Sequence, residues 1–185
     1  MCRFLAPSCF LALGIAIACS DANSLPAPTE VNAEVTDTLG ALEGTPIAVP
    51  SGYNISTGPV RTDQTVQFEF AYNVRRLADG SYQRVFLPRA ALGLTSTDAN
   101  PGLIRQNPIF EQITRAPSNG YTADSAVPIQ VGDRFVVRSR VVCGIGVPLY
   151  GKLEVLSFQD STVIFRVLTD LNCGYRDLSP GLPKN

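Results

Sequence analysis

Apolar and polar residues alternate along three neighbouring segments near the C-terminal end of the chain. These segments are residues 134–142, 149–158 and 162–169. An apolar side chain at every second position is typical of a β-strand with one buried face. Short connections join the three segments, so the pattern predicts an antiparallel meander. One of its faces would be apolar, and the other partly exposed to solvent.

The same alternation occurs earlier, over residues 66–74, where apolar side chains fall on one face and polar side chains on the other. The apolar residues are Val66, Phe68, Phe70, Tyr72 and Val74. Asp79-Gly80 follows and favours a tight hairpin turn, because both residue types tolerate a positive φ angle. A strand over residues 82–87 is then expected to pair with the first, and Pro88 to end it.

The stretch between this hairpin and the meander contains the one expected helix. Asn107 and Pro108 suit the N-cap and the first helical position, so residues 108–114 are expected to form two helical turns. Ile109 and Ile113 would share the core-facing side of this helix. Together the elements predict an all-β fold. It would be an antiparallel sandwich or partly open barrel with a C-terminal three-strand meander and at most one short helix.

The start of the chain has the layout of a secretory signal peptide. A short, singly positive start precedes an apolar run over residues 4–18, which is shorter than the ~20 residues needed to cross a bilayer. Ala16-Ile17-Ala18-Cys19 resembles the lipobox of bacterial lipoproteins. The resemblance implies cleavage before Cys19, a diacylglycerol thioether on its sulfur and an acyl group such as palmitate on the new N-terminus. The alternative is an ordinary signal peptide cut nearby, in which case Cys19 has no special role.

The segment that follows Cys19 is predicted to be a tether. Residues 19–43 contain two prolines, many small or polar residues and no aromatic residue, so they bury little apolar surface. The expected organisation is a signal peptide at 1–18, a lipidated flexible tether at 19–43 and a single β-rich domain at 44–185. The implied location is extracytoplasmic, anchored by lipid to the bacterial cell envelope. Ser20, rather than Asp, after the cysteine resembles lipoproteins sorted to the outer membrane where a cell has two membranes.

Composition excludes several classes of function. The 185 residues include no histidine, which removes the commonest metal ligand and the commonest general base. A net charge of −1 argues against a general affinity for nucleic acid. No phosphate-binding loop, dinucleotide-binding motif or nucleophile elbow is present, so no cofactor is expected and the domain is interpreted as non-catalytic. The alternative is an envelope hydrolase of unrecognised type that uses a pair of carboxylates.

Cys143 and Cys173 follow the first and third strands of the predicted meander and are the cysteines left after lipidation. The ends of these two strands would lie roughly 10 Å apart, which exceeds the ~7 Å that a disulfide permits between Cα atoms. Both cysteines, however, belong to loops that can converge, so a disulfide is predicted. The alternatives are two buried free thiols or two ligands of a metal site, and the latter lacks the remaining ligands that zinc requires.

Four basic residues of the meander are predicted to project from one face of the sheet as a candidate binding face. They are Arg138, Arg140, Lys152 and Arg166, with Glu154 among them. Arginine binds carboxylate and phosphate groups through paired hydrogen bonds, so an anionic ligand or an envelope protein is the expected partner. The alternative is that these are exposed strand residues balanced by acidic neighbours on adjacent strands.

The meander also resembles a known family. Val137-Arg138-Ser139 and residues 150–157 and 163–169 are similar to the C-terminal pattern of HmuY-like lipoproteins. The resemblance implies an all-β surface protein. Some members bind haem through histidines, which this chain lacks, so no haem is expected. The predicted function is that of a membrane-anchored lipoprotein whose β-domain binds a ligand or partner or has a structural role in the envelope.

Overall fold

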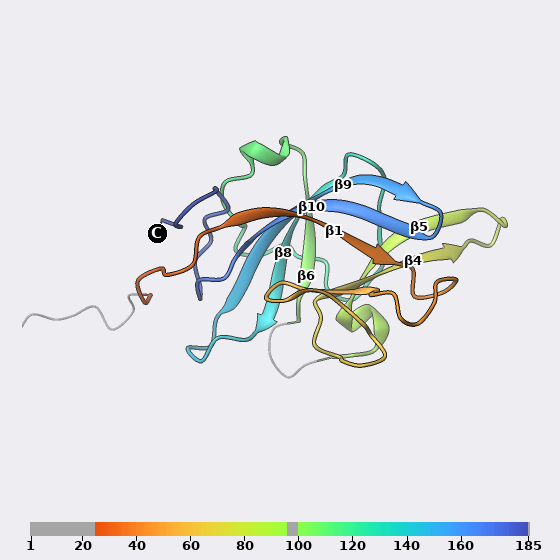
Figure 1. Ribbon diagram of the computed structural model, residues 1–185, viewed down its shortest axis with the longest axis horizontal. Coiled ribbons are helices and arrows are strands. Elements are labelled where there is room, and N and C mark those ends of the chain that lie inside the picture. The colour runs from red at the N-terminus through yellow and green to blue at the C-terminus, as the bar shows by residue number, and fades with distance from the viewer. Residues whose placement is uncertain (1–24, 96–99, 185) are drawn as a thin grey trace, which may run out of the picture.

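The computed structural model describes residues 25–95 and 100–184, which form two antiparallel sheets packed around a common core (Figure 1). The first sheet has the strand order β1 (Ala33–Gly40), β10 (Thr162–Asp170), β9 (Pro148–Gln159), β8 (Arg134–Val141) and β6 (Gly102–Gln106). The second has the order β3 (Gly58–Val60), β2 (Gly52–Asn54), β4 (Phe70–Arg76), β5 (Tyr82–Pro88) and β7 (Val127–Pro128). This arrangement confirms the predicted all-β sandwich. No helix in the described ranges is long and apolar enough to cross a bilayer.

The predicted meander is confirmed, because β8, β9 and β10 are consecutive neighbours in the first sheet. Phe135 is paired with Leu153, and Leu153 with Val167, so their side chains share one face across the three strands. This face packs against the second sheet. Phe86 of β5 lies with its ring centroid 6.0 Å from that of Phe135 and 6.3 Å from that of Phe165. Aromatic contacts of this kind join the two sheets.

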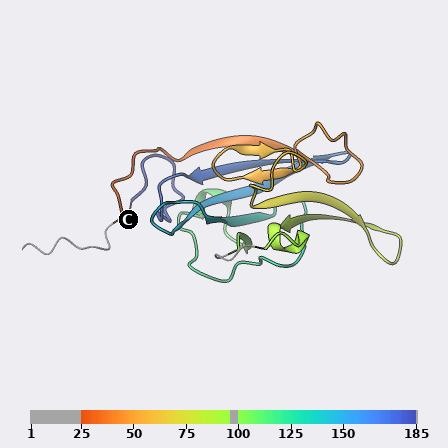
Figure 2. The ribbon, with the colours of Figure 1, turned by 90° about the horizontal axis from the view of Figure 1, so that it is seen from below.

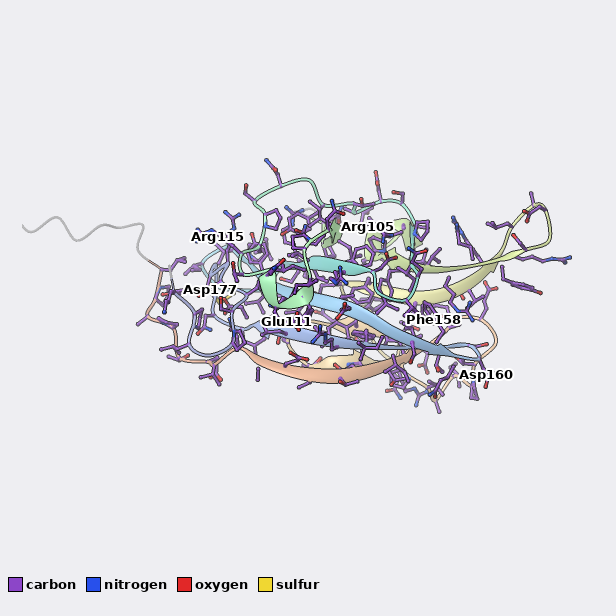
Figure 3. The ribbon with its side chains drawn as sticks, turned by 90° about the horizontal axis from the view of Figure 1, so that it is seen from above. Arg105, Glu111, Arg115, Phe158, Asp160 and Asp177 are labelled. Carbon is purple, nitrogen blue, oxygen red and sulfur yellow. A yellow bond between two sulfur atoms is a disulfide. The ribbon has the colours of Figure 1, made fainter. Side chains whose placement is uncertain are left out.

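The opposite face of the first sheet is also covered, contrary to the prediction of a partly wet face. Val136 and Leu168 from this face form a second apolar cluster with Phe110, Ile113 and Leu178. The covering residues come from the β6–β8 connection and from the chain after β10, and Figure 3 shows the turn at Glu111 lying over the sheet. Aliphatic residues among the charges on this face explain the cover, because they gain free energy when they leave water.

The hairpin of β4 and β5 is confirmed, with Arg76 paired to Tyr82 and Gly80 at a φ of 85° in the turn. The first strand, however, begins at Phe70 rather than at Val66, whose side chain is 47% exposed. The face predicted to be polar is buried as well, since Asn73 of β4 is 8% exposed and Glu69, just before the strand, is 1% exposed. The chain after β1 reaches this face, where Glu43 donates its backbone N–H to the side chain of Asn73 at 3.2 Å, and the alternation of the strand does not reveal this contact.

The prediction of a flexible tether up to residue 43 is wrong for its second half. Residues 33–40 form β1, an edge strand that is paired with β10 over its whole length. The upstream residues Thr29 and Glu30 donate their backbone N–H groups to the side chain of Asn172, at 2.8 and 3.0 Å. An edge strand is held by the ladder of a neighbour and needs few apolar residues of its own. Residues 1–24, including the predicted signal peptide and Cys19, lie outside the described part of the chain.

The expected helix at 108–114 is shorter than predicted. Phe110–Gln112 form a single 3-10 turn, η2. Ile113 is buried as expected, but Ile109 is 50% exposed. A second 3-10 turn, η1, covers Arg89–Leu92 directly after Pro88. Both turns lie in connections between strands, where tertiary contacts outweigh the weak helix preference of so short a segment.

The predicted disulfide is present between Cys143 and Cys173, whose Cα atoms are 5.8 Å apart. The loops after β8 and β10 converge as expected. Gly174, next to Cys173, donates its backbone N–H to the carbonyl of Pro148 at the start of β9, at 3.3 Å. The disulfide therefore ties the β8–β9 loop to the C-terminal segment at one end of the sandwich.

Replacing Cys143 and Cys173 together by alanine is expected to lower the free energy of unfolding by about 3–4 kcal/mol. The cross-link spans a sequence separation of 30, and its loss frees the unfolded chain. Denaturant titration of the oxidised protein, the reduced protein and the double variant measures the effect. Reduced wild type should match the variant. Equal stability of all three samples would contradict the prediction.

Candidate functional site

The predicted basic face does not form as one exposed surface, and Lys152 is the clearest reason. Its side chain is only 1% exposed. The ammonium group donates to the carbonyls of Phe110 and Ile113, both at 2.9 Å, and lies 4.5 Å from the centre of the Phe110 ring. Burial lowers the pKa of Lys152. This residue therefore holds the η2 turn against the sheet and has no surface left for a ligand.

Arg166 projects from the same face but is enclosed by acidic partners. Its guanidinium forms ion pairs with Glu154 at 2.6 Å and with Glu111 of η2 at 2.9 Å. The second oxygen of Glu154 accepts a hydrogen bond from Arg134 at 2.8 Å. The charges on this face thus neutralise one another across β8, β9 and β10. The sequence had left open the alternative that the basic residues are balanced by acidic neighbours on adjacent strands, and this is the arrangement seen for Arg166.

Arg138 also lies on this face, where its guanidinium covers the Tyr121 ring at 4.7 Å and donates to the Asn100 carbonyl at 3.1 Å. Arg140 does not share the face, which corrects the prediction. The pairing of β8 with β9 is interrupted by a bulge between Arg138 and Val141. A bulge adds a residue to one strand and redirects the side chains that follow it.

Arg140 turns instead toward Glu69, the residue just before β4 of the second sheet, and the two groups are 3.5 Å apart. Glu69 is buried and accepts the backbone N–H of Ile55 at 2.8 Å. Burial raises the pKa of Glu69, and Arg140 partly opposes this rise. The pair joins the two sheets and is enclosed by them.

A different place, an open groove at one side of the sandwich, combines cationic and aromatic side chains. Its volume is about 670 Å³. The walls come from β5, β6, β9 and the chain after β7, and include Tyr82, Arg84, Arg105, Asp133 and Phe158. Arg105 and Phe158 lie in the half of the molecule away from Arg115 and Asp177 (Figure 3). We call this site the β5–β9 groove.

Arg105 forms one fixed wall of the β5–β9 groove. It makes an ion pair with Asp133, donates to the carbonyl of Pro128 at 2.6 Å and lies 4.7 Å from the centre of the Phe135 ring. Its charge is therefore compensated within the protein, and its position is set by three separate contacts.

Arg84 of β5 differs, because none of the described carboxylates forms an ion pair with it. Its guanidinium lies 4.5 Å from the centre of the Phe158 ring. The Nε–H group is buried and has no hydrogen-bond partner, and neither has the nearby Tyr72 hydroxyl. Burial raises the pKa of Tyr72, an effect that the Arg84 cation opposes. An arginine held on an aromatic ring, with its charge uncompensated, is suited to bind a carboxylate or phosphate.

Sequence reasoning missed the β5–β9 groove because its residues come from four separate segments. Arg84 lies in a strand that was correctly predicted, where it reads as an ordinary polar residue of the alternating pattern. Only the packing of β5 beside the end of β9 places it on Phe158. The sequence offers no local signal for the site, because the 71% exposure of Tyr82, two residues before Arg84, is also a result of the tertiary structure.

In the described part of the chain, the carboxyl groups whose pKa is raised lie away from the β5–β9 groove. Within the described residues, no three acidic, cysteine or histidine side chains are arranged to hold a metal ion. Burial raises the pKa of two carboxyl groups, those of Glu69 and Asp170, and neither lines the groove. Asp170 accepts two hydrogen bonds from Asn172 at the end of β10.

Comparisons with protein-family models, with curated protein sequences and with solved structures find no significant match to this chain. The likeness of residues 16–19 to a lipobox and that of the meander to HmuY-like lipoproteins therefore stay predictions.

Replacing Lys152 by methionine is expected to destabilise the protein by about 1–3 kcal/mol, because the carbonyls of Phe110 and Ile113 lose their donor while they remain buried. Denaturant unfolding measures the change. Lys184→Met is the matched control, since Lys184 is exposed, and it should change stability by less than about 0.5 kcal/mol. Equal effects of the two substitutions would contradict the assigned role of Lys152.

Proposed function

We propose that this chain is an extracytoplasmic, lipid-anchored β-sandwich that binds an anionic ligand in the β5–β9 groove without transforming it. The observation that carries the proposal is Arg84, a cation that faces the groove and pairs with none of the described carboxylates. Arg84 is partly exposed where it lines the groove, so an incoming anion can supply the electrostatic partner that none of the described carboxylates provides.

The lining of the groove defines the class of ligand. Phe158 and Ile129 offer apolar surface beside Arg84, and Tyr82 offers an exposed aromatic ring. A ligand with one carboxylate or phosphate and an attached apolar or aromatic part could pair with the Arg84 cation and also contact the apolar surface. Arg105, the other arginine of the groove, is already paired with Asp133. A ligand with a single negative charge is therefore favoured over one with several.

Two features support the proposed compartment. The disulfide between Cys143 and Cys173 belongs to proteins of oxidising environments such as the periplasm or cell surface. The residues before Cys19 resemble a signal peptide with a lipobox. Two or three acyl chains on Cys19 would hold the domain at a membrane, since each buried CH₂ contributes about 0.8 kcal/mol.

Binding in the groove is tested by titrating isotope-labelled protein with benzoate and with inorganic phosphate, followed by NMR shifts of backbone amides. We expect benzoate to shift amides of β5 and of the β9 end, and Arg84→Gln to weaken its binding by about tenfold or more, the loss of a charge-assisted hydrogen bond.

The matched control is Arg61→Gln, which removes an exposed cation that pairs with Asp63 outside the groove. It should leave benzoate binding unchanged. Binding of phosphate as tight as that of benzoate would remove the role of the apolar surface. Undiminished binding by the Arg84 variant would overturn the assignment of the site.

The lipid anchor is tested by expressing the chain and its Cys19→Ser variant in a bacterial host. The wild type is expected in the membrane fraction, with the mass of a lipid thioether on its N-terminal peptide, because the thioether bond forms on the Cys19 sulfur. The variant should appear in the soluble extracytoplasmic fraction. An unmodified Cys19 peptide from the wild type would contradict the proposed anchor.

A further inference from the structure

The described chain begins and ends at the same end of the sandwich, and exposed apolar side chains gather there. Leu25 contacts the loop at Gly174, and the last described residues lie close by (Figures 1 and 2). Exposed large apolar residues of this end include Val31 at 65%, Ile145 at 53%, Leu182 at 52% and Leu171 at 38%. We call these four residues the apolar tip.

Backbone pairing places three of these residues together. Asn32 and Gly181 exchange backbone hydrogen bonds of 2.8 and 3.0 Å, so the next residues outward, Val31 and Leu182, are direct neighbours. Val31 and Leu171 both lie two residues beyond the last pair of β1 and β10, which puts them opposite one another. The side chain of Asn32 turns inward and donates to the carbonyl of Asp177 at 2.7 Å, so that of Val31 turns outward.

The disulfide and a set of polar contacts hold this end in shape. The hydroxyl of Tyr175 donates to the carbonyl of Pro26 at 2.9 Å, and the amide of Asn172 donates to the carbonyl of Glu30 at 2.8 Å. The segment from Pro26 to Glu30 is therefore fixed against the C-terminal segment. Consequently, the place from which the chain departs toward Cys19 is set by the fold.

The length of chain between Cys19 and Leu25 limits where the domain can sit. A chain spans at most ~3.6 Å per residue, so the Cα atoms of these two residues lie within about 22 Å of each other. The sandwich is longer than this, because the 12 residues of β9 alone extend about 40 Å. A lipid on Cys19 thus brings the apolar tip close to the bilayer, while the far end remains out of reach.

We infer that the apolar tip docks on the membrane surface, with Val31, Ile145, Leu171 and Leu182 in the interfacial region of the bilayer. This inference rests on the proposed lipid anchor at Cys19. Apolar side chains at an interface gain free energy by leaving water, and Lys184 beside Leu182 can reach the lipid headgroups. Phe158 lies toward the far end of β9, so the β5–β9 groove faces away from the membrane (Figure 3).

Lys184 provides a direct measurement, because the only other lysine of the chain, Lys152, is buried. The lipidated protein is placed in phosphatidylcholine vesicles, and the rate at which an amine-reactive reagent modifies Lys184 is compared with the rate in the soluble Cys19→Ser form. We expect modification to slow several-fold in the vesicles.

An internal control is added with Ile47→Lys. Ile47 is 71% exposed and lies in the loop after β1, where Ala41 donates its backbone N–H to Ser161 of the β9–β10 turn at the far end. Its modification rate should be the same in both samples. A lipidated protein in which Lys184 reacts at an unchanged rate would overturn the docking and leave the anchor intact. A Cys19 without lipid would remove the anchor and the docking together.

A double variant, Val31→Glu with Leu182→Glu, tests the apolar tip itself. Both positions are exposed, so the thermal unfolding of the soluble form should not change. In vesicles, the lipidated variant is expected to show the fast modification of Lys184 that is typical of the soluble form. Ile47→Glu is the matched control and should leave Lys184 protected. Continued protection in the double variant would show that the apolar tip does not hold this orientation.

Discussion

The burial of the first sheet on both faces is the constraint on which the rest of the structure depends. One face supplies the core shared with the second sheet, and the other carries lysine, arginine and glutamate among aliphatic residues. Charges on a covered face must be neutralised or hydrogen-bonded, because desolvation of an unpaired ion is costly. Lys152 donates hydrogen bonds to carbonyls at η2. Arg166 forms ion pairs with Glu154 and Glu111.

Because both faces of the first sheet are covered, its arginines pair with groups of the protein itself, whereas an arginine outside it can bind a ligand. The arginines of the meander are used within the fold, on acids, carbonyls or aromatic rings. Arg84 lies at the margin of the sandwich, where β5 passes the end of β9, and it keeps an aromatic support without an acidic partner. Its position explains why the proposed binding function belongs to the β5–β9 groove rather than to the predicted basic face.

The two ends of the sandwich differ in character. One end gathers the disulfide, the chain segment that leads toward Cys19 and the four residues of the apolar tip. The other end carries the β9–β10 turn and the approach to the β5–β9 groove. In the proposed function, the difference between the two ends matters, because an anchor that holds one end at the membrane exposes the other end to ligands in the surrounding compartment.

The sequence by itself determined the fold class, the meander, the β4–β5 hairpin and the disulfide partners. These features depend on local alternation, on turn residues such as Asp79-Gly80 and on the small number of cysteines. The start of the fold was missed, because β1 has little apolar character and is held by the edge of β10. The burial of Lys152, the turning of Arg140 by a bulge and the site at Arg84 were decided by tertiary structure alone. The physical reason is that alternation assigns a side chain to a face, whereas its exposure and its partners depend on segments distant in the sequence.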